Sequence, residues 1–228
     1  MIPQEASVEE PAKCELQRLY DLRFRESQQY RRRVWKILTR DFFQALIPSS
    51  SHVLDLGCGW GEFINQIDAA LKYGMDLNAE SRQRLAPNIH FIEQDCSAKW
   101  PLGDRSLDVV FSSNFFEHLR SKDDLCRILG QVHRCLKPGG RLICMGPNIK
   151  YLPGRYWDFW DHYLPLTEQS LREVLELVGF EVESCIARFV PYQMVRRKPT
   201  PLLLVWLYLK LPWTWHFFGE QFLVIARA

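Results

Sequence analysis

Three alternate glycines follow an apolar run in the first third of the sequence. From Val53 the chain reads Val-Leu-Asp-Leu-Gly-Cys-Gly-Trp-Gly, which predicts a buried strand that turns into a loop. Gly57, Gly59 and Gly61 let the backbone turn sharply and approach a ligand closely, because they carry no Cβ atom. The segment therefore predicts a loop that holds a nucleoside cofactor.

Glu62 follows the last of these glycines and narrows the choice of cofactor. A dinucleotide-binding loop of the Gly-x-Gly-x-x-Gly type offers a helix N-terminus to a pyrophosphate. A carboxylate at this place would repel a pyrophosphate but would tolerate a cation. The pattern therefore favours S-adenosylmethionine, a sulfonium without a phosphate.

Two carboxylates end the next two predicted strands. Asp76 ends the strand over 72–76, at a distance from Asp55 that is typical of an acid that binds ribose hydroxyls. Asp95 ends the strand over 89–95, where we expect it to accept a hydrogen bond from the adenine amino group. The predicted cofactor contacts are Asp55, Gly57, Cys58, Gly59, Gly61, Asp76, Leu77, Asp95, Cys96 and Asn114.

The segment 112–119 follows another predicted strand and carries the leading candidates for catalysis. A hydroxyl acceptor has to lose a proton during methyl transfer, and an imidazole can take it near neutral pH. His118 is therefore the first candidate for the general base, with His162 as the second and Glu117 as the third. The alternative is that Glu117 and His118 only cap the next helix and hold the loop.

A cluster of aromatic and polar residues lies between 151 and 163. Aromatic faces suit a sugar ring or a flat aromatic acceptor, and the acid can bind hydroxyls. The predicted acceptor contacts are Tyr151, Tyr156, Trp157, Trp160 and Asp161. On a helix, Asp158, Asp161 and His162 could share a face and bind a metal, but Pro153 and Gly154 interrupt the run and no fourth ligand is evident. We therefore predict no metal.

Alternating strands and helices must position these residues. Apolar strands are predicted from Val53 onward and over 72–76, 89–95, 107–114, 136–144, 182–189 and 221–227. Helices are predicted over about 13–46, 60–70, 121–136 and 168–178, the last with Thr167 as N-cap and Gly179 as its stop. Such alternation predicts a parallel sheet with helices on both faces.

In this order, the glycine loop, the acids and the turns resemble the class I S-adenosylmethionine-dependent methyltransferases. The resemblance covers about 34–148 and, more loosely, 161–180, which resembles bacterial small-molecule and glycan methyltransferases. It implies an α/β fold with a Rossmann-like, doubly wound, mostly parallel sheet of seven strands. It also implies that the last strand runs antiparallel between the fifth and sixth, and that Asn114 touches the methionine portion of the cofactor.

Length and composition predict one catalytic domain. The chain has 228 residues, 47% of them hydrophobic, which is enough for one sizeable core. We expect an N-terminal helical cap over 1–48 and a methyltransferase domain over 49–228. The odd number of cysteines, seven, and the lack of a signal-peptide pattern predict a cytoplasmic protein, with contact to the inner face of a membrane left open.

An aromatic and basic insertion over 191–219 separates the last two predicted strands, which in the family commonly form a near-direct hairpin. Residues 192–219 carry four Lys or Arg and no acid, and 202–209 form an apolar run. Three covers for this surface are open: the domain itself, a second copy in a homodimer, or a membrane contacted through 196–218. Residues 13–40 are also basic, with nine Lys or Arg against three acids.

The predicted reaction is O-methylation of a sugar, a glycolipid or a small metabolite. Nucleic-acid amino-methyltransferases usually place prolines after the fourth strand, whereas Asn114 is followed by Phe-Phe-Glu. A small-molecule, glycan or lipid-linked acceptor is therefore favoured over nucleic acid. The alternatives are a catalytically inactive S-adenosylmethionine-binding assembly or regulatory subunit and, third, a nucleic-acid-associated methyltransferase.

Overall fold

The computed structural model describes residues 18–19, 22–23, 26–192 and 199–228. They form an α/β fold around one seven-stranded sheet, with the strand order β3-β2-β1-β4-β5-β7-β6. The strands are β1 (His52–Leu56), β2 (Leu71–Asp76), β3 (Ile89–Glu93), β4 (Leu107–Ser113), β5 (Leu136–Pro147), β6 (Glu181–Ile186) and β7 (Gln221–Arg227). The first five run parallel, and β7 runs antiparallel between β5 and β6. This order confirms the predicted fold.

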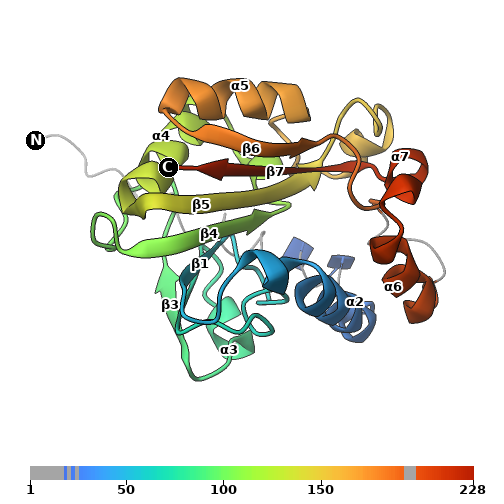
Figure 1. Ribbon diagram of the computed structural model, residues 1–228, viewed down its shortest axis with the longest axis horizontal. Coiled ribbons are helices and arrows are strands. Elements are labelled where there is room, and N and C mark those ends of the chain that lie inside the picture. Colours follow the sequence, from blue (N-terminus) through green and yellow to red (C-terminus); the bar gives the residue numbers. More distant parts are fainter. Residues whose placement is uncertain (1–17, 20–21, 24–25, 193–198) are drawn as a thin grey trace, which may run out of the picture.

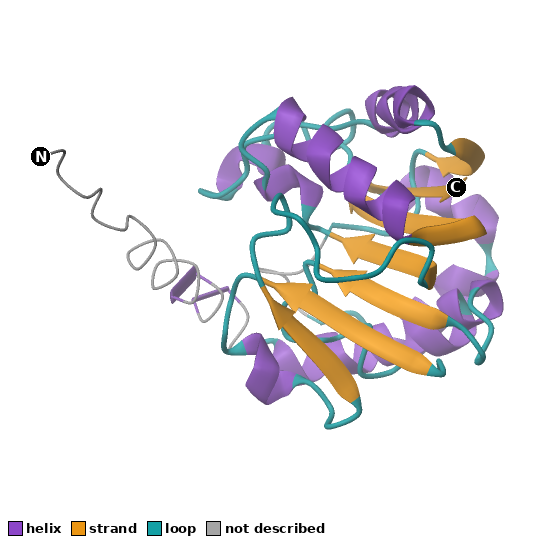
Figure 2. Cartoon of the chain, turned by 90° about the vertical axis from the view of Figure 1, so that its left-hand side faces the viewer, coloured by secondary structure: helices purple, strands orange, loops and turns teal. Residues whose placement is uncertain are grey.

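Helices cover both faces of the sheet (Figures 1 and 2). The α-helices are α2 (Gln28–Asp41), α3 (Ser81–Arg84), α4 (Lys122–Cys135), α5 (Glu168–Val178), α6 (Leu202–Lys210) and α7 (Trp215–Phe218). Short 3₁₀ turns are η1 (Phe43–Leu46), η2 (Phe116–His118), η3 (Arg155–Asp158) and η4 (Pro212–Thr214). None of the helices among the described residues is long and apolar enough to span a membrane.

Strand alternation divides the core into two clusters. Leu54 of β1 and Val110 of β4 face the cluster that includes buried residues of α4 and α5. Their neighbours Val53 and Val109 face the other cluster, which includes buried residues of α2, α6 and α7. Successive side chains of a strand point to opposite faces, so each strand contributes to both clusters.

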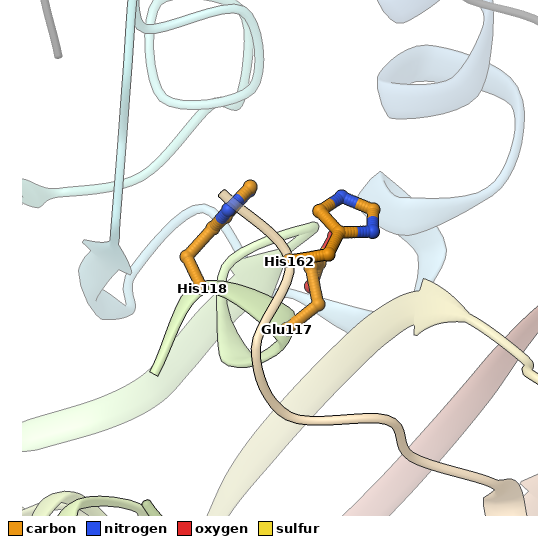
Figure 3. Close-up of side chains that lie close together, drawn as sticks. All are labelled: Glu117, His118 and His162. Carbon is orange, nitrogen blue, oxygen red and sulfur yellow. The ribbon is translucent and has the colours of Figure 1, made fainter. Parts of the chain in front are cut away.

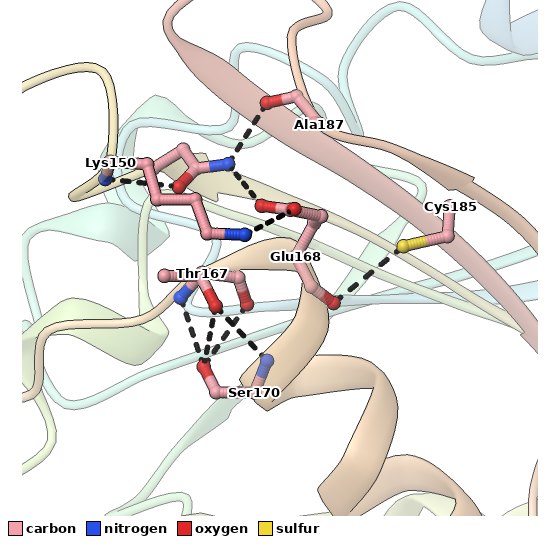
Figure 4. A network of polar contacts seen from close by, with 7 residues as sticks. Lys150, Thr167, Glu168, Ser170, Cys185 and Ala187 are labelled. Atoms are coloured by element: carbon pink, nitrogen blue, oxygen red, sulfur yellow. Dashed lines mark hydrogen bonds and ion pairs between the residues drawn. The ribbon is translucent and has the colours of Figure 1, made fainter.

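The predicted helix boundaries of α4 and α5 are confirmed. The Thr167 hydroxyl accepts a hydrogen bond from the Ser170 amide, and Gly179 closes α5 with φ of 103°. Beside this cap, the Glu168 carboxylate accepts hydrogen bonds from the Asn148 amide and the Lys150 ammonium, each at 2.6 Å. Figure 4 shows how this network ties the chain after β5 to the start of α5.

The predicted crossover helix over 60–70 is wrong. This stretch consists of turns, with isolated bonds from the Asn65 amide to the Gly61 carbonyl and from the Ile67 amide to the Phe63 carbonyl. The side chain of Asn65 instead bonds the backbone at Arg84 and Ala86. Asn65 therefore joins this segment to the chain around α3, a tertiary contact that replaces a regular helix.

The insertion over 191–219 forms α6, η4 and α7 within its described part. α6 packs beside α2, and the buried Leu209 and Trp215 belong to the core cluster on that face. The insertion is therefore partly covered by its own domain. The basic residues over 196–198 lie outside the described residues.

Candidate functional site

A pocket opens at the carboxyl ends of β1 and β4, where ligands bind in sheets of this kind. Its floor includes Gly57, Cys58 and Gly59 of the glycine loop together with Asn114. Its roof comes from distant parts of the chain: the N-terminal segment and α2, η2, the loop after η3, and the chain after β6. The roof residues used below are Arg23, Arg31, Glu117, His118, His162 and Tyr192, which line the pocket, and Asp161 behind them.

The floor is held by backbone hydrogen bonds. The Gly57 and Cys58 amides both donate to the Met75 carbonyl, at 2.9 and 3.0 Å. Asp76 accepts from the Gly59 amide at 2.7 Å through one oxygen and from the Asn78 amide at 2.9 Å through the other. Burial raises the pKa of Asp76, although these bonds oppose the shift. The acid at the end of β2 therefore fixes the loop from below.

The loop fits a ligand that lies against bare backbone. Gly57, Gly59 and Gly61 have φ of 71°, 50° and 73°, in the left-handed region that favours glycine. A Cβ on Gly57 would lie 2.5 Å from Cγ of Phe115. Asn114 also has φ of 51°, a conformation that is rare outside glycine and is common at functional sites. Gly57 and Gly59 therefore present backbone in the pocket that a nucleoside can approach closely, whereas Gly61 lies against Leu85 and Asn65 outside the lining.

Glu62 lies at the pocket in an ion pair that the sequence did not predict. Its Oε1 accepts from Nη2 of Arg31 at 2.9 Å and from Nε at 3.0 Å. The guanidinium balances the carboxylate, so Glu62 alone does not distinguish a sulfonium from a pyrophosphate. Next to it, burial raises the pKa of Asp55 well above its usual range, and Glu62 and Asp76 raise it further.

Five predicted cofactor contacts lie outside the pocket lining: Gly61, Asp76, Leu77, Asp95 and Cys96. Asp95 is exposed, and its Oδ1 accepts hydrogen bonds from the amide and hydroxyl of Ser97, each at 2.8 Å. Cys96 is buried in the core, and Leu77 is half-buried after β2. The proposed contact between Asp95 and adenine stays a prediction.

His118 is oriented by Asp161. Its Nδ1 lies 2.8 Å from the Asp161 carbonyl oxygen and 3.3 Å from the Asp161 carboxylate. Arg23 grips the same carboxylate with both terminal nitrogens, one of them at 2.9 Å. Burial would raise the pKa of Asp161, but Arg23 and His118 outweigh it and lower the pKa. The predicted base and the predicted acceptor-binding acid therefore meet at this site.

Glu117 and His162 lie beside His118 (Figure 3). One donor atom from each of the three residues lies within 4.8 Å of the other two, so the set could hold a metal ion. Burial raises the pKa of Glu117 to about 7, and Glu117 Oε1 has no hydrogen-bond partner among the described residues. Burial lowers the pKa of His162 to about 4, so His162 is neutral near pH 7. His162 is therefore a weaker base than the sequence predicts.

The predicted acceptor contacts are mostly not brought to the pocket. Tyr156 is fully buried and donates its hydroxyl to the Leu164 carbonyl at 2.6 Å, so its assignment to acceptor binding is corrected to a core residue. Trp157 and Trp160 are exposed outside the lining, and Tyr151 packs under the guanidinium of Arg188. In this segment the chain makes only the short turn η3, so the helix on which Asp158, Asp161 and His162 could share a face does not form.

Sequence reasoning missed three residues of the roof: Arg23, Arg31 and Tyr192. Tyr192 lies 3.5 Å from Nε2 of His162 through its hydroxyl and lines the pocket. The basic stretch over 13–40 was a weak signal for the two arginines, because it showed positive charge but not which acids the arginines contact. Nothing in the spacing around Tyr192 indicated a role, because its position depends on the path of the chain after β6.

Curated proteins that are similar to this chain in sequence are named as methyltransferases. A probable S-adenosylmethionine-dependent methyltransferase of Mycolicibacterium smegmatis is 35% identical over 145 residues, 60% of this chain and 54% of that relative. A demethylmenaquinone methyltransferase of Symbiobacterium thermophilum is 27% identical, over 59% of each chain. The chain thus spans just over half the length of these curated relatives.

A solved structure matches the fold of this chain, and a family model matches its sequence. The crystal structure of a methyltransferase of Archaeoglobus fulgidus aligns with a TM-score of 0.64 at 21% identity, covering 86% of this chain and 94% of that one. A family model described as a methyltransferase domain matches residues 27–185, more than half of the chain. The chain therefore belongs to the methyltransferase-domain family, as a class I S-adenosylmethionine-dependent member whose cofactor is S-adenosylmethionine.

Proposed function

We propose that this protein transfers the methyl group of S-adenosylmethionine to a hydroxyl of a sugar, a glycolipid or a small metabolite. One observation carries the proposal: His118 lines the pocket beside the cofactor loop while its Nδ1 is bound by the Asp161 carbonyl. A carbonyl oxygen only accepts, so Nδ1 holds the proton. Nε2 then keeps the lone pair that a general base needs.

The residues of the roof support this role for His118. When bound, the cofactor supplies an electrophilic methyl group on its sulfonium. As the acceptor oxygen forms its bond to the methyl carbon and the bond to sulfur breaks, the hydroxyl proton would pass to Nε2 of His118. The Asp161 carboxylate, 3.3 Å from Nδ1, would stabilise the resulting imidazolium. Arg23 keeps that carboxylate charged and in place.

The pocket walls also favour a positioning role. Methyl transfer is an in-line displacement, so much of its acceleration comes from alignment in a dry site. Trp35, Phe159 and Tyr192 line the pocket with apolar surface, and Arg23 of the N-terminal segment and Arg31 of α2 also line it. The relative from Symbiobacterium thermophilum is named as a demethylmenaquinone methyltransferase, which supports a small-molecule acceptor.

The test is methyl transfer from labelled cofactor to candidate acceptors of these classes, with the variant His118→Asn. We expect kcat to fall by about a hundredfold or more while cofactor affinity stays near wild type. The acid limb of the pH profile should disappear together with the base. His90→Asn, on the exposed side of β3, is the matched control and should leave kcat unchanged.

Other outcomes would point to another function. Full turnover by His118→Asn would contradict the assignment of the base and leave alignment alone as the source of acceleration. Cofactor binding without product from any acceptor would indicate a binding subunit that has lost catalysis. Steeply salt-dependent retention on RNA or DNA would instead favour a nucleic-acid acceptor.

A further inference from the structure

α6 carries apolar side chains on both of its sides. On the inner side, Leu209 is buried and the Tyr208 hydroxyl donates to the Phe189 carbonyl at 2.7 Å. On the outer side, Leu203, Leu204 and Leu207 are exposed, and Leu211 continues the same stripe after the helix. A helix at the surface of a soluble domain normally turns a polar face to water. The outer leucines therefore indicate a surface that something else covers.

The exposed apolar surface continues over η4 and α7. Trp213, Phe217 and Phe218 each leave more than 60% of their surface exposed, whereas Trp215 between them is buried. Trp215 packs edge-on against Phe42 and Phe189, which fixes the orientation of α7. The outer patch consists of Leu203, Leu204, Leu207, Leu211, Trp213, Phe217 and Phe218. Its size and aromatic content are typical of an interaction surface rather than of scattered exposed residues.

The charges around the outer patch have a single sign within its own segment. Residues 199–219 contain no Asp or Glu, and Lys210 is exposed at the end of α6. α2 lies beside α6 (Figure 1), and the Tyr30 hydroxyl donates to the Thr200 carbonyl at 2.9 Å. α2 exposes Arg33 and Lys36 and, at the same helical spacing, Arg40, which pairs with Asp41 at 2.8 Å. A basic stripe thus lies on the helix next to the patch.

We propose that the outer patch docks on the surface of an anionic lipid bilayer. Leucines and phenylalanines can enter the boundary between headgroups and acyl chains, where tryptophan is also favoured. Lysines and arginines beside them attract anionic headgroups. A second copy of the chain would bring the same basic residues against one another, which is unfavourable. The absence of acids over 199–219 therefore favours a bilayer over a homodimer.

The patch is joined to the wall of the pocket. β7 begins at Gln221, after the two residues that follow α7, and pairs there with Pro147 at the carboxyl end of β5. The Arg188 guanidinium donates to the Phe217 carbonyl at 2.9 Å and to the Gly219 carbonyl at 2.7 Å. The Tyr192 amide donates to the Glu220 carboxylate at 3.0 Å. Docking would therefore hold the pocket near the headgroups, and, resting on the proposed function, this favours a lipid-linked acceptor.

The experiment is flotation of the full chain with vesicles of phosphatidylcholine alone or mixed with phosphatidylglycerol. We expect the wild type to float with the mixed vesicles, less with the neutral ones, and less again at high salt. Trp213→Ser/Phe217→Ser should weaken binding to mixed vesicles by at least about tenfold, because two aromatic side chains no longer enter the bilayer. Lys210→Glu should weaken it by a smaller factor.

Leu177→Ser is the matched control, because Leu177 is an exposed leucine on α5, which packs on the opposite face of the sheet. It should float like the wild type. Each variant is checked by its melting temperature, and Lys210→Glu alone tests the charge if the aromatic variant is unstable. A wild type that fails to float with mixed vesicles would overturn the proposal, and so would equal flotation of the patch variants.

Light scattering tests the alternative that a second copy of the chain covers the outer patch. If the wild type does not bind vesicles but forms a dimer, and the patch variants abolish that dimer, a second copy of the chain covers the outer patch. This result would overturn the proposal of bilayer docking. Flotation needs neither cofactor nor turnover, so its result is independent of the proposed reaction. A protein that floats but methylates no acceptor would contradict the reaction and leave the docking surface intact.

Discussion

The floor and the roof of the pocket are built in different ways. The floor is backbone: alternate glycines, strand ends and amides that bond Met75 and Asp76. The roof is side chains from segments far apart in the sequence, with Arg23 reaching Asp161 across 138 positions. The comparison indicates that floor changes should act on cofactor binding, whereas roof changes should act on turnover and on pH dependence.

The largest expected effect is on the floor, from Gly57→Ala. The new Cβ would lie 2.5 Å from Phe115 Cγ, and alanine is strained at φ of 71°. We expect calorimetry to show that cofactor affinity falls by about a hundredfold or more. The strain and the clash displace the loop, which costs roughly 3 kcal/mol of binding free energy. Gly130→Ala in α4, where nothing lies within 4 Å, should slightly raise the melting temperature and leave binding alone. Normal affinity in Gly57→Ala would contradict the placement of the cofactor on this loop.

The floor could be predicted from the sequence to a greater extent than the roof. The glycine loop and the caps at Thr167 and Gly179 depend on local chemistry, and the structure confirms them. The strand order was implied by the family resemblance, and the structure confirms it as well. The pairing of Arg23 with Asp161 joins residues 138 positions apart, which no local pattern specifies. Tyr156 was misassigned for the same reason, because an aromatic residue near a site can equally belong to the core.

The next effect concerns stability and tests the roof. Burial raises the pKa of Glu117 to about 7 from an ordinary value of 4.5, so the folded protein binds this proton more tightly than the unfolded chain. Wild-type stability should therefore fall as pH rises through this window, whereas Glu117→Gln has no proton to lose. Between about pH 4 and pH 8, the stability of Glu117→Gln should rise relative to wild type by about 3 kcal/mol.

Chemical denaturation at several pH values measures this difference. Glu173→Gln, at an exposed position of α5, is the control and should follow the wild type. A difference between Glu117→Gln and wild type that does not change with pH would mean that Glu117 ionises like an exposed carboxyl group. It would also mean that the roof is wetter than the structure indicates.

A smaller effect is expected on the floor from Asp76→Ala. The substitution leaves the Gly59 and Asn78 amides without their carboxylate partner, and it removes the predicted acceptor for ribose hydroxyls. Cofactor affinity should fall by about 2 kcal/mol, roughly thirtyfold, as when a charged hydrogen-bond partner is lost. Asp95→Ala should weaken binding less, because Asp95 is exposed and adenine can also stack on apolar neighbours. Equal losses would contradict the distinction between the two acids.

Asp161→Asn should separate orientation from binding in the roof. The amide keeps the shape of the side chain and the backbone carbonyl that binds His118, but it loses the ion pair with Arg23. We expect kcat to fall by about tenfold, because the imidazolium loses a charged partner worth ~1.4 kcal/mol, while cofactor affinity changes little. A loss confined to cofactor affinity would place Asp161 with the floor instead.

The smallest expected effect is that of metal removal on the cluster of Glu117, His118 and His162. Their donor atoms are close enough for an ion. However, Nδ1 of His118 is engaged by Asp161, and burial holds Glu117 partly protonated near neutral pH, which weakens it as a ligand. Dialysis against a chelator should therefore leave turnover unchanged, and added Mg²⁺, Mn²⁺ or Zn²⁺ should not raise it. If chelation abolished turnover and one of these ions restored it, the cluster would be a metal site. His118 would then act as a ligand rather than as a base, and the roof would act on the acceptor through the ion.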